Sequence, residues 1–152
     1  MADKVIYTSD GVLLSRIMRE HLNKWPERPS DVMLEDHSRE MPSMMIQQLA
    51  AAVKKRSYIN GSYIGSWMFS VYIQIDGKDT ASRLDALKCL TDLDEWLNLK
   101  DTAGHFINLP AIDPKRTAIQ VIMPNAPSVS AKYESGVEEY QAIFEMEYKY
   151  SV

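Results

Sequence analysis

The sequence predicts an α+β domain, with a mostly antiparallel sheet of about four to six strands and two helices packed on one face. The first observation is that apolar side chains alternate with a period of two along residues 63–76, which is typical of a strand. The apolar face consists of Tyr63, Trp67, Phe69, Val71, Ile73 and Ile75. This long strand is the element around which we expect the sheet to form.

The second observation is a change of period after residue 79. From Thr80 the apolar residues recur about every 3.6 positions, which predicts an amphipathic helix that ends near residue 100. Asp79 or Thr80 is expected to cap its first turn. The stripe expected to face the sheet consists of Leu84, Leu87, Leu90, Leu93 and Leu97, with Trp96 beside it.

The remaining elements follow from the same patterns. A first helix is expected over residues 10–25, ended by Pro26, and strands are expected over residues 31–36, 43–49, 53–59, 117–123 and 137–150. Asn60-Gly61 predicts a type I′ turn that pairs the strand before it antiparallel with residues 63–76. Residues 124–136, with two prolines and few apolar side chains, are expected to be a long exposed loop.

Composition restricts the class of protein. The length of 152 residues favours one domain, and the net charge of −4 argues against a dedicated nucleic-acid binder. The single cysteine, Cys89, excludes an internal disulfide and suits a reducing compartment. We expect neither a membrane helix, since no run approaches the ~20 apolar residues it needs, nor a signal peptide.

One segment superficially resembles a phosphate-binding loop. Residues 75–80 join a strand to a helix and contain Gly-Lys-x-Thr. However, Tyr72 stands where that loop needs a glycine, and Asp79, which follows Lys78, would repel a phosphate. A plain turn is the better interpretation.

The histidines and the cysteine give no catalytic or metal-binding pattern. His21, His37 and His105 lack partners at metal-ligand spacing, and His21 lies on the apolar side of the first helix, where a packing role is expected. His37 lies in an acidic segment that we expect to be a solvated loop, with weak metal binding as the alternative. Cys89 is expected to be an inert packing thiol. We therefore predict no catalytic, metal-binding or cofactor-binding residue, and no enzyme.

Several segments together resemble the minor capsid proteins of phages and prophages known as tail terminators, or tail completion and head–tail joining proteins. The resemblance covers about residues 40–150 and rests on the order and spacing of the segments NGSYIG (60–65), FSVY (69–72), DTASRLDAL (79–87) and EYQAIF (139–144). It implies an α+β subunit that forms a ring, usually of six copies, which caps the tail tube and joins it to the head connector. The expected partners are its own copies, the tail tube protein and the connector protein, with DNA passing through. The expected location is the virion, after assembly in the bacterial cytoplasm.

This interpretation suggests two groups of functional residues. In the loop 124–136 we expect Tyr133 to anchor a contact with a neighbouring subunit or the tube, helped by Lys132 and Glu134, and we expect the loop to become ordered on assembly. Met44 and Met45 are further contact candidates, although core packing is the other interpretation. The candidates for an acidic channel wall or its rim are Glu138, Glu139, Glu145 and Glu147, the alternative being an outward solvated strand face.

Other functions remain open on the sequence alone. One is a small-ligand-binding or enzymatic α+β domain with a site between sheet and helices, which a deep pocket with convergent polar groups would favour. Another is a cytoplasmic interaction module that acts as a dimer. Within the phage interpretation, a head-closure or tail-tube subunit is the nearest alternative.

Overall fold

The computed structural model describes residues 6–7, 10–35, 37, 40–77 and 80–152. Within these ranges the chain forms two helices, α1 (Asp10–Leu22) and α2 (Thr80–Leu97), and nine strands. The strands are β1 (Ile6–Tyr7), β2 (Val32–Leu34), β3 (Ser43–Gln48), β4 (Val53–Ser57), β5 (Tyr63–Asp76), β6 (Ala111–Asp113), β7 (Arg116–Ile122), β8 (Ser128–Lys132) and β9 (Val137–Tyr150). The α+β class is confirmed.

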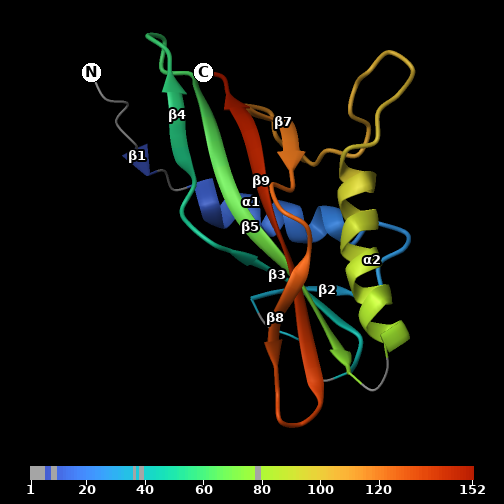
Figure 1. Cartoon of the computed structure of the whole chain (residues 1–152). Coiled ribbons are helices and arrows are strands. Elements are labelled where there is room, and N and C mark those ends of the chain that lie inside the picture. The colour runs from blue at the N-terminus through green and yellow to red at the C-terminus, as the bar shows by residue number, and fades with distance from the viewer. Residues whose placement is uncertain (1–5, 8–9, 36, 38–39, 78–79) are drawn as a thin grey trace.

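The strands form one sheet around the antiparallel pair β5 and β9 (Figure 1). These two strands pair along their whole length, from Tyr63 opposite Tyr150 to Asp76 opposite Val137. The other edge of β5 pairs with β4 and β3, and the other edge of β9 pairs with β7 and β8. The sheet thus has two long central strands and two shorter strands, end to end, on each side of them.

The expected sheet of four to six mostly antiparallel strands is wrong in size and type. Nine strands form it in the described part of the chain, and it is mixed, because β2 runs parallel to β3. The three strands that the sequence did not predict are β1, β6 and β8, and of these β1 and β6 have only two or three residues each, too few to show a period in the sequence.

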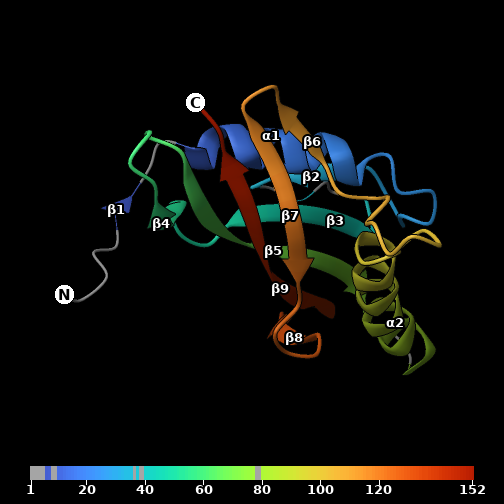
Figure 2. The same ribbon diagram turned by 90° about the horizontal axis from the view of Figure 1, so that it is seen from above.

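Both helices contribute to a single core on one face of the sheet. Figures 1 and 2 show α1 crossing behind the central strands and α2 standing beside them. The predicted alternation of β5 and β9 is confirmed, because the side chains that face the helices are buried and those between them are more exposed. The largest fully buried side chains of this core include Leu14, Met18 and Leu22 of α1, Leu90 of α2, Trp67 and Phe69 of β5, and Phe144 and Tyr148 of β9.

The expected buried face of α2 is partly wrong. Leu90, Leu93 and Leu97 are fully buried, but Leu84 is 60% exposed and Ala86 takes its place in the stripe. At about 100° per residue, the thirteen positions from Leu84 to Leu97 leave these two side chains about 140° apart around the helix axis. The run of leucines is therefore wider than one face. Of the two predicted caps, Asp79 lies outside the described residues, and Thr80 is the first residue of the helix.

The hairpin at Asn60-Gly61 is confirmed, but the turn type is wrong. A type I′ turn needs positive φ at both central residues. Gly61 has φ of 91°, but Asn60 does not have a positive φ, because Glu35 is the only non-glycine residue with positive φ in the described ranges. The Tyr58 amide donates to Ser62 O (2.8 Å) and the Gly61 amide donates to Tyr58 O (3.1 Å), which defines a three-residue loop closed by a left-handed glycine.

The expected loop over residues 124–136 is also wrong, because it contains β8. Ser128 lies opposite Gln141 of β9, and Lys132 lies opposite Glu138. The chain then turns through a second three-residue loop, in which the Tyr133 amide donates to Val137 O (2.9 Å) and Gly136 has φ of 93°. The residues of β8 are almost all exposed, so the strand has no apolar alternation that would predict it.

Helix α1 ends at Leu22, one turn before the expected position. Beyond Leu22 the backbone continues in tighter turns, in which the Lys24 amide donates to His21 O (3.0 Å) and the Trp25 amide donates to Leu22 O (3.1 Å). The Asn23 side chain bonds to β2, because its Nδ2 donates to Val32 O (3.2 Å) and its Oδ1 accepts from the Val32 amide (2.8 Å). Asn23 thus attaches the start of β2 to the end of α1. Trp25 nevertheless remains buried in the core, as its place in the apolar pattern predicts.

Candidate functional site

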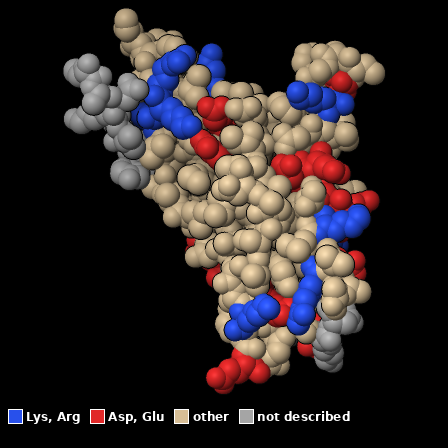
Figure 3. Space-filling view, viewed as in Figure 1, with Lys and Arg blue, Asp and Glu red and all other residues tan. Residues whose placement is uncertain are grey.

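The sheet face opposite the helices is the candidate functional surface, because three of the four predicted channel residues lie on it. Residues directly opposite each other in an antiparallel pair share a face. Glu139 lies opposite Gln74, Glu145 opposite Met68, and Glu147 opposite Ser66. Figure 3 views the molecule from the side on which the strands lie in front of α1, and charged side chains there surround a broad uncharged centre.

Glu138 does not belong to this group. Its side chain lies on the helix-facing side of β9, is buried, and accepts hydrogen bonds from Arg83 Nε (2.8 Å) and Tyr140 OH (3.1 Å). Burial alone would raise the pKa of Glu138, but these donors outweigh it and keep the pKa below its ordinary value. The sequence grouping of four carboxylates is corrected to three, because Glu138 and Glu139 are neighbours in a strand and point to opposite faces.

Each of the remaining three carboxylates has a partner within the chain. Glu145 Oε1 accepts from Lys55 Nζ (2.5 Å) and from Ser66 Oγ (2.7 Å), and these bonds lower the pKa of Glu145. Glu147 accepts from Gln120 Nε2 (2.6 Å). Because Lys55 neutralises Glu145 and Glu138 faces the other way, this face is less negative than four free carboxylates would make it.

Glu139 is the centre of a polar row across four strands. Its Oε1 accepts from Gln74 Nε2 of β5 (3.3 Å), and its Oε2 accepts from Ser130 Oγ of β8 (2.8 Å). His37 Nε2 lies 3.1 Å from Glu139 Oε1, and His37 Nδ1 lies 2.8 Å from Ser43 Oγ of β3. His37 is therefore not the residue of a solvated loop that we expected, because its side chain is only 11% exposed.

Ser43, His37 and Glu139 are joined in the order serine, histidine, carboxylate, which is the order of a hydrolytic triad. Ser43 is completely buried, and in this conformation no substrate carbonyl reaches its hydroxyl. The arrangement instead connects His37 to the sheet. No group of three or more ligands that could hold a metal ion occurs in the part of the chain that the structure describes.

A second polar cluster is buried among the helices and strands, and the sequence gives no sign of it. Asp10, the first residue of α1, accepts from Tyr63 OH and Tyr148 OH (2.6 Å each) and from Arg116 (2.9 Å). Arg116 also donates to Asp113 (2.7 Å). Burial and the bond to Asp10 raise the pKa of Tyr63 to about 12. The cluster joins α1, β5, β7 and β9, which is a structural role.

The other sequence candidates take packing roles or lie at the surface. His21 Nε2 is 2.6 Å from Asn108 O and its ring lies beside Trp96, as its predicted packing role requires. Burial raises the pKa of the Cys89 thiol to about 11, which disfavours a reactive thiolate. His105 is exposed. Lys78 and Asp79 of the phosphate-loop lookalike lie outside the described residues.

The predicted assembly contacts fall into two sets. Tyr133 and Glu134 lie exposed at the tip of the β8–β9 hairpin, and Lys132 lies 3.7 Å from the carboxylate of Glu138. Met44 is fully buried and Met45 almost so, which leaves Met44 no surface for a partner in this conformation. Met44 points into the core opposite Ile73, and Met45 lies opposite Tyr72 on the other face.

The sequence matches no protein-family model, and no curated protein matches it significantly. Neither helix of the described chain is long and apolar enough to span a membrane.

Proposed function

We propose that this protein is a virion structural subunit of the tail terminator kind. In this proposal it forms a ring with copies of itself, six in number, that caps the tail tube and joins it to the head connector. The sequence resemblance over residues 40–150 supports the proposal, and so does the α+β fold, which the resemblance implies.

The β8–β9 hairpin is the observation that carries the proposal. Strand β8 pairs with β9 on one edge, and no described strand pairs with its other edge, which leaves backbone groups available to another chain. Val129 and Tyr133 on this hairpin are 46% and 48% exposed. A hairpin of this kind suits contact with the tube, because its backbone is already ordered and a tyrosine adds contact area at low entropic cost.

The sheet face with Glu139, Glu145 and Glu147 is the surface that we assign to the channel. Lys55 neutralises Glu145, and Arg56 and Lys149 are exposed cations at the β4–β5 end of the same face, so the negative charge that we assign to the channel is that of Glu139 and Glu147. A stretch of channel wall that presents carboxylates in place of cations does not release counterions from DNA, and DNA then slides past it instead of binding. A head-closure or tail-tube subunit would use the same face in the same way.

The test is the mass of the purified protein in solution by light scattering, followed by electron microscopy for rings. Tail tubes assembled from the co-expressed tube protein then report capping. Tyr133→Ser should keep the ring and lose capping, whereas the control Ile107→Ser, at a residue that is 54% exposed elsewhere, should keep both. A protein that stays monomeric at all concentrations, with and without tubes, contradicts the proposal.

A further inference from the structure

The tip of the β4–β5 hairpin exposes an apolar side chain that the fold does not use. Ile59 is fully exposed at the centre of the loop, and Tyr58 beside it is 42% exposed. Arg56 and Lys149 lie in one row with Ile64 between them, so both cations flank this tip on the same face of the sheet. The hairpin tip, residues 58–62, is thus an apolar knob with a basic border.

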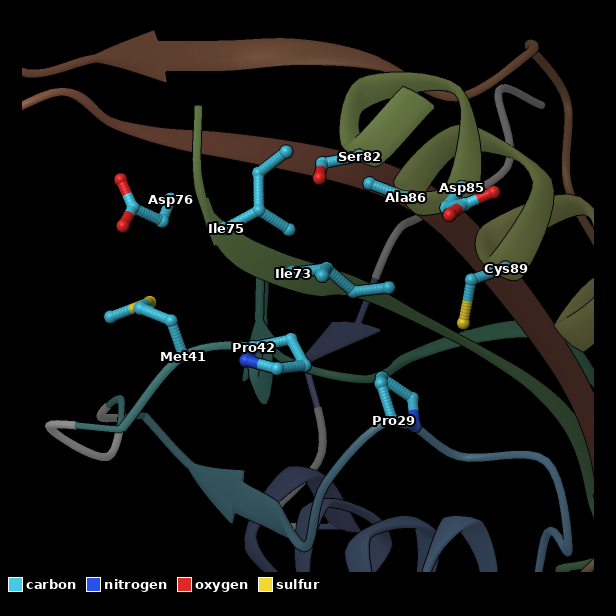
Figure 4. Close-up of a pocket in the computed structure, with 10 residues that line it drawn as sticks. All are labelled: Pro29, Met41, Pro42, Ile73, Ile75, Asp76, Ser82, Asp85, Ala86 and Cys89. Carbon is cyan, nitrogen blue, oxygen red and sulfur yellow. The ribbon is translucent and has the colours of Figure 1, made fainter. Parts of the chain in front are cut away.

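A pocket of complementary character lies at the other end of the molecule, between β5 and α2 (Figure 4). Its volume is about 300 Å³. The apolar part of its wall includes Ile73 and Ile75 of β5, Ala86 and Cys89 of α2, and Pro29, Met41 and Pro42. Asp76 and Asp85 are its charged residues, and neither lysine nor arginine lines it in the described part of the chain. We call this the α2 pocket.

The knob and the α2 pocket match in size and charge. A cavity of ~150 Å³ holds a benzene molecule, so the α2 pocket has room for an isoleucine side chain and part of its loop. Cations beside Ile59 would meet carboxylates beside the pocket, which favours this pairing over others and speeds its formation. Within one chain the two cannot meet, because they lie at opposite ends of β5.

We infer that neighbouring copies of this chain join head to tail, with Ile59 of one copy seated in the α2 pocket of the next. This inference rests on the proposed ring and names its contact. A contact between two different patches is heterologous, and such contacts close into rings when the rotation between copies allows it. The length of β5, about 43 Å at ~3.3 Å per residue, sets the spacing between copies.

Four variants test the contact, and all of them change exposed residues. Ile59→Asp removes the knob, and Asp85→Lys reverses a charge at the pocket. Ile107→Asp and Glu95→Lys are their matched controls, since Ile107 is also an exposed isoleucine and Glu95 is an exposed carboxylate on the same helix. Light scattering over a concentration series measures assembly, and thermal unfolding confirms that each variant folds.

We expect Ile59→Asp to raise the dissociation constant of the contact by about 10–100-fold, the effect of losing one buried isoleucine. Asp85→Lys should weaken it as well, and the two controls should assemble as the wild type does. An equal mixture of Ile59→Asp and Asp85→Lys protein should restore association, at least to a two-chain species. The intact knob of the Asp85→Lys protein then meets the intact pocket of the Ile59→Asp protein.

Two outcomes would overturn the inference and leave the proposed function standing. One is a wild-type ring that Ile59→Asp leaves intact. The other is a pair of assembly-deficient variants whose mixture stays monomeric. A wild-type protein that never assembles contradicts the proposed function itself, together with this contact. Binding of a small amine in the α2 pocket of such a monomer would assign the pocket to a ligand.

Discussion

Replacing Leu90 with alanine tests the packing of α2 against the sheet most directly. Leu90 is fully buried within the core cluster that includes Trp67 and Phe69. The change removes three carbon atoms, worth about 2.4 kcal/mol at ~0.8 kcal/mol for each buried methylene. Incomplete collapse of the site adds a cavity term, so we expect a total loss of ~2–5 kcal/mol in the free energy of unfolding.

Leu84→Ala is the matched control, because it is the same change on the same helix at a side chain that is 60% exposed. It should cost less than ~0.5 kcal/mol. Urea unfolding at one fixed protein concentration measures both variants, since self-association would otherwise add to stability. The slope of the free energy of unfolding against urea concentration should equal that of the wild type if both variants unfold in a two-state transition. Equal losses for the two variants, or a loss below ~1 kcal/mol for Leu90→Ala, would refute the assigned helix face.

Three further predictions concern the polar clusters and the hairpin. The pKa of Asp10 lies below its ordinary value of 3.8, because bonds from Tyr148, Tyr63 and Arg116 outweigh burial, which raises it. The ionised Asp10 therefore stabilises the fold fully at pH values above 3.8. In acid unfolding, the stability advantage of the wild type over Asp10→Asn should disappear as the pH falls below ~3.8. A difference in stability that does not depend on pH would contradict this prediction. Glu147→Lys should make the assembled protein retain DNA in a gel-shift assay, with binding that weakens at high salt; retention unchanged from the wild type would argue against a channel wall. In the monomer, hydrogen exchange should show protected amides in residues 128–132 that pair with β9 and rapid exchange at the tip 134–136; uniformly fast exchange would mean that β8 is not formed.

The sequence predicts elements best where a periodic pattern is long. Strands β5 and β9 each have fourteen residues with one apolar face, and their bounds and buried sides were predictable. Strand β8 was missed because its residues are exposed on both faces, so that only pairing with β9 defines it. The predicted apolar stripe of α2 wrongly included Leu84, because the sequence does not distinguish a leucine at the edge of an apolar face from one at its centre.

The functional residues were less predictable than the elements. Period two separates Glu138 from Glu139, so the assignment of these neighbours to opposite faces follows from the strand itself. The contact of His37 with Glu139 joins residues 102 positions apart, and that of Asp10 with Arg116 joins residues 106 apart. Neither pair shares an element, so no spacing rule in the sequence indicates it.

The sequence alone determined the α+β class, the long central strands and the apolar faces that must be buried. These depend on local periodicity, which each segment carries in its own residues. Only the tertiary structure decided the number of strands, the partners of the carboxylates, and the placement of Ile59 and the α2 pocket at opposite ends of β5. These depend on strand register and on the packing of distant segments, which follow from the free energy of the whole chain.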